Sequence, residues 1–453
     1  MPLSRVFRST RVVLPDGVRA ASVHVRNGTI DAVRDAEDVP AGVPLTDVGD
    51  LVLLPGLVDT HVHINDPGRD AWEGFETATR AAAAGGVTTL VDMPLNSIPP
   101  TTTLAGLEAK ARAAEGRVAV DVGFCGGLVP GNVGQLAALF EAGAVAFKCF
   151  LAESGVPEFS HVGEEDLSLG MKRLAEIGAP LFVHAELPGP LARAVERQAR
   201  AGAIDPRTYA VWLDARPPEA EDLAVDLVIH RSREMRARAH VVHLSSASAL
   251  GAIRRAKDAG AAVSAETCPH YLTFASEDIP DGATEYKCAP PIRARDNRER
   301  LWDALRERLL DQVVTDHSPS TAELKCSGSG DFVAAWGGIA SLQLGLAAVW
   351  TSARARGHTL SDVADWMCRA PARLVGLEKK GRIAPGCDAD LVVWDPDADF
   401  VVDARNLEHK NKVTPYDRRA LSGRVLETWL RGEKIFDRGA FSNARRGEWI
   451  RRA

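Results

Sequence analysis

Two histidines, His61 and His63, stand one residue apart in the stretch LVLLPGLVDTHVHIND. Because successive side chains of a β-strand point to opposite faces, this spacing places both imidazoles on one side of a strand. Such a pair can bind a metal ion, or it can be a hydrogen-bonded structural pair. The spacing alone leaves both interpretations open, so the rest of the chain has to decide between them.

Four other ionisable residues stand near the ends of further apolar segments: Lys148 in AVAFKCF, His184 in PLFVHAE, His243 in HVVHLSS and Asp316 in DQVVTDHSP. Each has an ordinary structural explanation when taken singly, such as a buried, hydrogen-bonded histidine or a helix cap. It is not expected by chance that several segments carry such residues at corresponding positions. Together with the first pair they offer four imidazoles and a carboxylate, which suit zinc and exceed the ligands of one tetrahedral ion. The set predicts two divalent metal ions, with zinc as the expected metal.

Lys148 restricts how such a site could work. A protonated lysine would be repelled by two divalent ions, so its amine must be neutral or must combine with carbon dioxide to form a carbamate. A carbamate is negatively charged and has two oxygens that can bridge two ions. Structural roles are assigned to the remaining histidines, of which His317 should face away from its neighbour Asp316: His24, His161, His230, His240, His270, His317, His358 and His409.

The segments that carry these residues alternate with helical stretches between residues 56 and 375. Eight apolar, β-rich segments separated by helices predict a parallel (β/α)8 TIM barrel, because parallel strands are covered on both faces and need crossover connections. Active sites of this fold lie at the carboxyl ends of the strands. Residues 1–55 and 376–453 consist of short β segments and turns, and we expect them to form one small β-sandwich domain together.

The composition points to a small molecule as the binding partner. The chain has 453 residues, 25% of them charged, and a formal net charge of −7. It has neither a basic tract nor a Lys/Arg-rich amphipathic stretch, so we expect no nucleic-acid partner and no membrane partner. The uncharged segment 332–350 is long enough to cross a bilayer, but its glycines, Ser341 and Gln343 favour a loop and a buried helix.

The cysteines and the N-terminal residues indicate a cytoplasmic protein. Seven cysteines are scattered without a Cys-x-x-Cys pair, which argues against a disulfide framework and favours a reducing compartment. Arginines interrupt the first residues before an apolar core could develop, so no signal peptide is expected.

The order His-x-His, Lys, His, His, Asp on a barrel between two β-rich ends resembles the amidohydrolase superfamily. In particular it is similar to the cyclic amidohydrolases, which include dihydroorotases, hydantoinases (dihydropyrimidinases) and allantoinases. The resemblance covers nearly the whole chain, including PARLVGL and GRIAPGCDADLVVWD. It implies that a carboxylated Lys148 bridges two metals, and it implies a homotetramer. It also implies one metal bound by His61, His63 and Asp316 and the other by His184 and His243.

Local stretches separate the members of this group. Asn65 stands where dihydroorotases have a carboxylate-binding arginine, and Glu153 stands where hydantoinases have a tyrosine that supports the oxyanion. The stretches HINDPGR, DMPLNSIPPTT, FKCFLAESGVPEF and KCAPPIR resemble allantoinases instead. The resemblance therefore implies hydrolysis of the hydantoin ring amide of allantoin to allantoate, a step of purine (urate) catabolism. Asp316 would accept the proton of the attacking water and deliver it to the departing ring nitrogen.

A neutral cyclic amide calls for a pocket of polar groups rather than an arginine clamp. The candidate substrate contacts are Asn65, Asn96, Cys288, Ala289 and Ser318, although ordinary loop hydrogen bonding explains each of them as well. Two alternatives remain open at this point. One is another cyclic amidohydrolase, either a hydantoinase or a dihydroorotase, and the other is a noncatalytic scaffold of the same fold.

Overall fold

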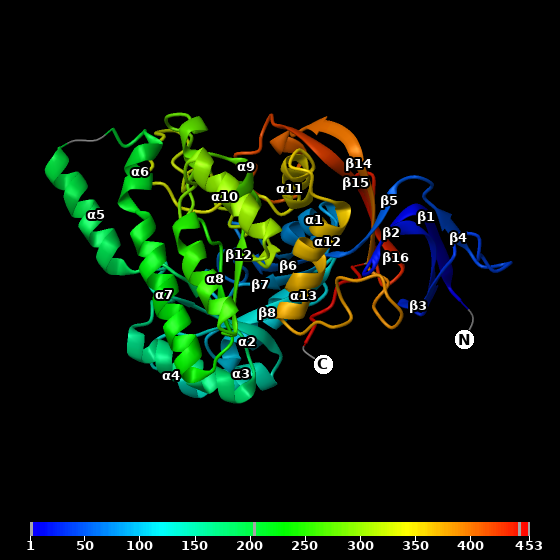
Figure 1. Ribbon diagram of the computed structural model, residues 1–453, viewed down its shortest axis with the longest axis horizontal. Helices are drawn as coiled ribbons and strands as arrows, with labels where there is room; N and C mark the ends of the chain where they lie inside the picture. Colours follow the sequence, from blue (N-terminus) through cyan, green and yellow to red (C-terminus); the bar gives the residue numbers. More distant parts are fainter. Residues whose placement is uncertain (1–2, 203–204, 443–444, 452–453) are drawn as a thin grey trace.

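Eight parallel strands form the centre of the molecule (Figure 1). The computed structural model describes residues 3–202, 205–442 and 445–451; the outermost residues of both predicted β segments, 1–2 and 452–453, lie outside the described residues, as do 203–204 and 443–444. The strands pair in sequence order, and they are β6 (Leu57–Val62), β7 (Val87–Asp92), β8 (Asp121–Gly127), β9 (Ala144–Phe150), β10 (Leu181–His184), β11 (Ala239–Val241), β12 (Val263–Thr267) and β13 (Gln312–Val313).

The barrel closes between its first and last strands just beyond β13. Val62 forms a parallel bridge with His317, and the His63 backbone N–H donates to the His317 carbonyl over 2.8 Å. All residues of β9 are buried, because one face of the strand points into the barrel and the other is covered by helices. The continuous apolar segments in the sequence have this cause, and the (β/α)8 prediction is confirmed.

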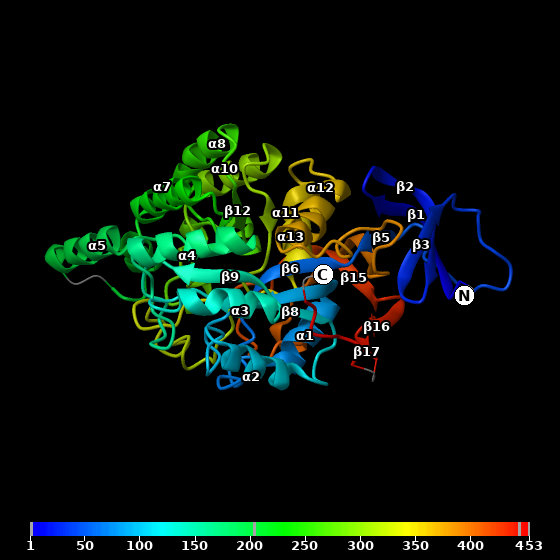
Figure 2. The same cartoon turned by 90° about the horizontal axis from the view of Figure 1, so that it is seen from below.

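Helices surround the barrel, and α5 projects from the side opposite the small β domain (Figure 2). The helices are α1 (Phe75–Ala84), α2 (Leu104–Ala114), α3 (Leu136–Glu141), α4 (Glu164–Ile177), α5 (Pro188–Ala201), α6 (Tyr209–Ala215), α7 (Pro218–Met235), α8 (Leu250–Asp258), α9 (Pro269–Thr273), α10 (Arg295–Arg306), α11 (Gly345–Arg354), α12 (Leu360–Ala364) and α13 (Ala370–Leu374). A π-helical segment, Asp365–Arg369, joins the last two. The uncharged segment 332–350 is a loop followed by the first part of α11, and within the described ranges no helix is long and apolar enough to cross a membrane.

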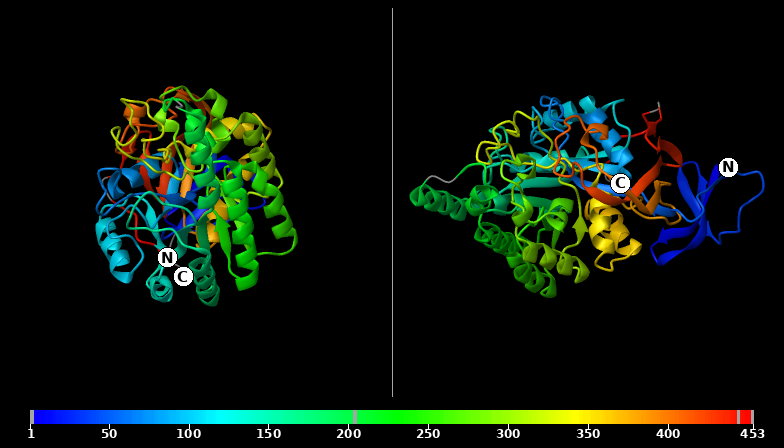
Figure 3. Two further views of the ribbon diagram at one scale, coloured as in Figure 1. Left: turned by 90° about the vertical axis from the view of Figure 1, so that its left-hand side faces the viewer. Right: turned by 90° about the horizontal axis from the view of Figure 1, so that it is seen from above.

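Strands from both ends of the chain form the second, mixed sheet, which lies beside the barrel (Figure 3). Its strands are β1 (Arg5–Leu14), β2 (Gly17–Arg26), β3 (Thr29–Arg34), β4 (Leu45–Asp47), β5 (Val52–Pro55), β14 (Leu391–Val401), β15 (Ala420–Leu430), β16 (Glu433–Asp437) and β17 (Ala440–Phe441). The antiparallel pairing of β5 with β14 joins the N-terminal strands to the C-terminal ones.

This sheet curls around its own apolar core. Phe7 of β1 and Trp429 of β15 make an edge-to-face contact at 4.9 Å, although β5 and β14 stand between their strands in the sheet order. The two halves therefore enclose a core like that of a sandwich, as expected from the sequence. We propose domain limits of 1–55 with 376–453 for the β domain and 56–375 for the barrel. The last described residues nevertheless return to the barrel, where Trp449 forms a parallel bridge with Val122 of β8.

A group of charges that is buried at Asp121, Lys380 and Asp390, the junction cluster, connects the two domains. It consists of Asp121, Lys380, Asp388, Asp390 and Arg431. Lys380 Nζ lies 2.6 Å from Asp121, 2.9 Å from Asp388 and 2.7 Å from Asp390. Arg431 Nη1 lies 2.5 Å from the same oxygen of Asp121. Every charge of the cluster has an opposite partner, which is what a buried ion network requires to be stable.

Candidate active site

The two histidines of the first strand point toward Asp316. His61 Nε2 and His63 Nε2 lie 3.3 Å and 3.4 Å from the same carboxylate oxygen of Asp316, and all three side chains are almost fully buried. The predicted common direction of the pair is therefore observed. Burial raises the pKa of Asp316, but the neighbouring His61, His63 and His243 lower it further than burial raises it, so the carboxylate stays ionised.

Two more histidines approach each other from β10 and from the end of β11. His184 Nδ1 and His243 Nε2 are 3.0 Å apart, so both nitrogens face the same small volume. His243 and Asp316 adopt left-handed backbone conformations, with φ of 39° and 44°. Such conformations cost about 1–3 kcal/mol in residues other than glycine and are found at functional sites. Ligand atoms of His61, His243 and Asp316 lie within 4.8 Å of one another, a spacing that can hold a metal ion.

Lys148 is fully buried beside these groups. Its Nζ has no hydrogen-bond partner among the described residues, and the Phe150 ring centre lies 5.0 Å away. Burial lowers the pKa of Lys148 to about 8. Carbamate formation requires the neutral amine, and the lowered pKa increases the neutral fraction relative to a free lysine, so the side chain fits the predicted role. His243 Nδ1 and His63 Nδ1 are also buried, and no described residue forms a hydrogen bond with them, so the cluster has polar atoms available for a ligand.

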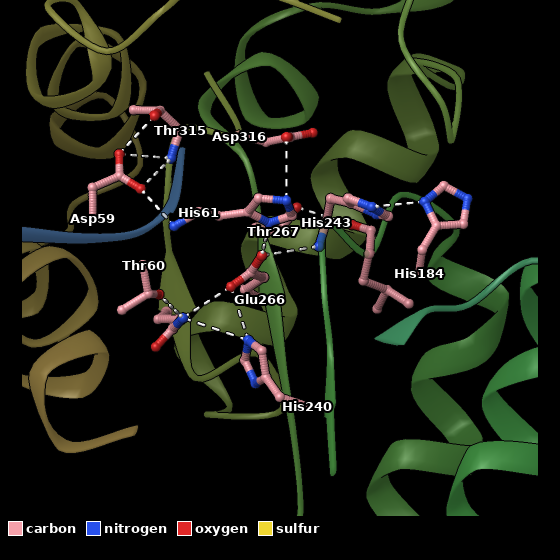
Figure 4. Close-up of polar contacts among 12 residues, drawn as sticks. Asp59, Thr60, His61, His184, His240, His243, Glu266, Thr267, Thr315 and Asp316 are labelled. Atoms are coloured by element: carbon pink, nitrogen blue, oxygen red, sulfur yellow. Dashed lines mark hydrogen bonds and ion pairs between the residues drawn. The ribbon is translucent and has the colours of Figure 1, made fainter. Parts of the chain in front are cut away.

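A carboxylate that the sequence did not reveal orients His61 (Figure 4). Glu266 of β12 accepts hydrogen bonds from His61 Nδ1 at 2.6 Å and from His240 Nε2 at 2.8 Å, and Gln312 donates a third at 2.9 Å. Burial raises the pKa of Glu266, but His61 and His240 lower it by more and keep it ionised. The bond at Nδ1 leaves His61 Nε2 free for a metal, which is the usual function of such supporting carboxylates.

Glu186 has the corresponding position beside His184. Its Oε2 lies 2.8 Å from His184 Nε2, which leaves His184 Nδ1 to face His243. The same carboxylate also forms an ion pair with Arg216. No sequence pattern points to Glu266, because its partners His61 and His240 come from other strands, whereas Glu186 stands only two residues after His184. His317, as expected, faces away from this site and bonds to Glu73 at 3.2 Å.

A cavity of about 270 Å³ opens above these residues, and it contains most of the predicted substrate contacts. Asn96, Cys288, Ala289 and Ser318 line it. Asn65, the fifth predicted contact, is not among the lining residues. Its side chain is buried and its Oδ1 accepts a hydrogen bond from Asn96 Nδ2 at 3.0 Å, so Asn65 supports the lining residue instead.

The cavity wall also contains two cationic side chains. Arg216 and Lys287 line the cavity together with Trp212 and Trp336, where the sequence predicted polar groups rather than an arginine clamp. Glu186 neutralises Arg216, however, and the guanidinium adds no net charge. Sequence spacing could not show this pair, because the arginine follows α6 and the glutamate follows β10.

Glu153 lies at the rim of the same cavity. Its side chain is 83% exposed and pairs with His161 Nδ1 at 3.1 Å. An exposed carboxylate cannot donate a hydrogen bond to an oxyanion when it is ionised. The position at which hydantoinases have a supporting tyrosine therefore offers no such donor in this chain.

Comparisons with known proteins agree with this geometry. Residues 52–432 match the model of the amidohydrolase family. The chain is similar to an allantoinase of Streptomyces avermitilis (54% identity, 96% of both chains) and to allantoinases of Arabidopsis thaliana (43%, 95% of this chain and 88% of the relative) and Saccharomyces cerevisiae (47%, 86% and 84%). Among solved structures, it is similar to the L-hydantoinase (dihydropyrimidinase) of Arthrobacter aurescens, with 31% identity, a TM-score of 0.94 and full coverage of both chains.

Proposed function

The chain belongs to the amidohydrolase family, and on this premise we propose that it opens the hydantoin ring of allantoin to give allantoate, a step of purine (urate) catabolism. It is a hydrolase that acts on the carbon–nitrogen bonds of a small cyclic amide. The main support for this substrate is the similarity to allantoinases from bacteria, plants and yeast, at 43–54% identity over most of the chain. Asn65 and Glu153, at positions where the related enzymes have other residues, support the same substrate.

The family depends on metal ions, and the residues present fit them. We propose that His61, His63 and Asp316 hold one divalent ion, that His184 and His243 hold the second, and that a carboxylated Lys148 bridges both. Zinc suits this imidazole-rich set of ligands. The partnerless Nζ of Lys148 and the facing nitrogens of His184 and His243 support the assignment. When bound, such ions polarise a carbonyl oxygen and lower the pKa of water.

Asp316 is the residue that would move the proton. Its carboxylate is ionised and faces the cavity from the end of the last strand, so it can accept the proton of the attacking water and pass it to the departing ring nitrogen. The Ser318 hydroxyl donates to Asp316 Oδ1 at 2.9 Å and holds the carboxylate in this direction. Glu266 and Glu186 keep the neighbouring imidazoles in the tautomers that leave their inner nitrogens free.

Recognition of the ring would depend on neutral polar groups. Asn96 can both donate to and accept from an amide, and its Oδ1 is buried without a partner among the described residues. We propose that Asn96, Ser318 and the backbone at Cys288 and Ala289 contact the hydantoin ring. Among the described residues that line the cavity the one arginine, Arg216, is paired with Glu186, so its charge is balanced and it makes a poor clamp for a dihydroorotate carboxylate.

We further propose that the protein forms a homotetramer and that it is cytoplasmic. The family resemblance supports the oligomer, and sedimentation of the purified protein would test it. A reducing compartment is supported by the cysteines: all seven lie within the described residues and are free thiols.

A substrate panel tests the proposed reaction. One preparation loaded with zinc would be assayed with allantoin, hydantoin, dihydrouracil and dihydroorotate. We expect kcat/KM for allantoin to exceed each of the others by at least about tenfold, which corresponds to about 1.4 kcal/mol of transition-state discrimination. Preference for dihydrouracil or dihydroorotate would overturn the allantoin assignment and leave the metal-dependent hydrolase in place.

A further inference from the structure

Arg216 stands in the cavity wall with its guanidinium held in a fixed orientation. It follows α6 directly, and its side chain is 15% exposed. Nε donates to Glu186 Oε1 at 3.0 Å and Nη2 donates to Glu186 Oε2 at 2.5 Å. This two-point pairing fixes the plane of the guanidinium as well as its position.

The guanidinium lies on the far side of His184 from the reaction centre. Glu186 Oε2 also accepts from His184 Nε2, whereas Nδ1 of that ring faces His243. One imidazole ring and one carboxylate therefore separate Arg216 from the nitrogens that we assign to the metals. Arg216 and the histidines line the same cavity, so a substituent that extends from the ring along the wall can approach the guanidinium.

Arg216 also has a hydrogen-bond donor that no described residue uses, on a side chain that its neighbours hold in place. Its Nη1 takes no part in the pairing with Glu186, and the described residues provide no hydrogen-bond partner for it. The Trp212 ring lies 5.0 Å from the guanidinium carbon and 4.0 Å from Lys287 Nζ. Trp212 Nε1 in turn donates to the Cys288 carbonyl at 2.7 Å, which fixes the ring against the cavity loop. A guanidinium N–H group held in this way is preorganised to bind an acceptor on the substrate.

We propose that Arg216 is the specificity residue for the ureido arm of allantoin and that its Nη1 donates to the ureido carbonyl. The inference rests on the proposed allantoin-opening function and deepens it. The ureido group is a neutral, planar acceptor that extends from the hydantoin ring. Because Glu186 neutralises the guanidinium, the position favours such a neutral carbonyl over an anion.

Comparison of allantoin with hydantoin tests this role, because hydantoin has both ring carbonyls and no ureido arm. In Arg216→Lys and Arg216→Gln, kcat/KM for allantoin should fall about 10- to 100-fold, mainly through KM, as expected for one hydrogen bond from a charged donor. For hydantoin it should change less than about threefold. Metal content should stay unchanged in Arg216→Lys, because lysine can still pair with Glu186.

Two control variants separate specificity from structure. Arg293 forms another buried pair, with Glu221 at 2.5 Å, and does not line the cavity; Arg293→Lys should leave the ratio of the two kcat/KM values unchanged. Glu186→Gln disturbs the orientation of His184, so it should lower metal content and both activities together. Equal losses on both substrates in Arg216→Lys, or no loss on either, would overturn the assignment to the ureido arm.

The wild-type protein offers a test that does not depend on the folding of any variant. The hydantoin derived from leucine has an isobutyl arm, which matches the shape of the ureido group but has no carbonyl. Its kcat/KM should be close to that of hydantoin and far below that of allantoin. If it matched allantoin, the arm would be recognised by shape and the role of Arg216 would be rejected. A wild-type protein that did not open allantoin at all would instead reject the proposed function.

Discussion

Lys148 and Lys380 are both buried lysines, and they stand at opposite ends of the barrel strands. Lys380 belongs to the junction cluster, where Asp121 is the first residue of β8, and three carboxylates lie within 2.9 Å of its Nζ. Lys148 stands near the carboxyl end of β9 and has no hydrogen-bond partner among the described residues. Burial acts in the same direction on the pKa of both lysines, but the final pKa values differ in opposite directions from that of a free lysine. The carboxylates raise the pKa of Lys380 despite its burial, whereas burial lowers that of Lys148 to about 8.

The difference separates a cluster that stabilises the fold from one that is built for chemistry. The junction cluster pairs each charge inside the protein, so it needs nothing from outside. Around Lys148, buried nitrogens face one another and unused valences remain, which costs stability unless a ligand fills them. Substitutions in the two clusters should therefore affect different measured quantities.

Asp316→Asn should give the largest loss of activity. The amide has nearly the same shape but cannot accept the proton of water, so kcat for allantoin should fall by about 10² to 10⁴ while the thermal midpoint changes little. Turnover and the bound metal would be measured on the same sample. Near-normal kcat with both metals present would place the proton transfer on another residue.

Lys380→Met should instead reduce stability and leave the chemistry intact. Removal of the lysine leaves buried carboxylates without their main partner, and the free energy of unfolding should fall by about 3–5 kcal/mol. The activity per bound metal of the folded fraction should match that of the wild type. Lys379→Met, in the exposed neighbouring residue, is the matched control and should stay within about 0.5 kcal/mol. Equal stability of the two variants would show that the junction cluster contributes nothing.

Glu266→Gln tests whether the carboxylate that orients His61 contributes to metal binding. A glutamine has a single acceptor oxygen and cannot serve both His61 and His240 as the carboxylate does. Metal affinity should decrease about 10- to 100-fold, measured by competition with a chelator. Glu307→Gln, at a half-exposed carboxylate paired with Arg254, is the control and should bind metal normally. Unchanged affinity in Glu266→Gln would remove the glutamate from the metal site.

Lys325 is a third buried lysine, and its only hydrogen-bond partners in the described chain are the carbonyls of Lys287 and Gly338. Burial lowers its pKa to about 7, whereas an unfolded lysine titrates near 10.4. Between these values the unfolded chain binds more protons, so this residue makes stability rise with pH, by at most about 1.4 kcal/mol per pH unit. Urea unfolding at pH 7 and pH 9 should show a smaller rise in Lys325→Met than in the wild type. Parallel pH dependences would show that Lys325 stays charged in the folded protein.

The sequence was sufficient to predict the barrel and the direction of its functional side chains. Apolar segments that alternate with helices are typical of a parallel barrel. The position of His61 and His63 at a strand end determines where their side chains point. The family and the reaction followed from the same residues, and the comparisons confirm both. What the sequence could not show was pairing between distant elements. Glu266 orients a histidine 205 residues away, and no local pattern marks it.

The substrate contacts show the same limit more clearly. Asn65 was expected in the cavity because of its place in the chain, but Asn96 occupies the wall and Asn65 lies behind it. Arg216 was not expected, because it stands 30 residues after its partner Glu186 in the sequence and no local pattern brings the two together. Chain position identifies the strand end at which a residue stands, but loop packing decides which side chain reaches the substrate.

Stepwise addition of zinc to the metal-free protein tests the central claim most directly. Allantoin hydrolysis and bound metal would be followed together, in the presence of bicarbonate. Activity should be absent without metal and should reach its maximum at two equivalents per chain, and Lys148→Arg should fail to recover it because a guanidinium cannot form the carbamate. Full activity at a reproducible ceiling of one ion, or full activity in Lys148→Arg, would contradict a two-metal site bridged by Lys148.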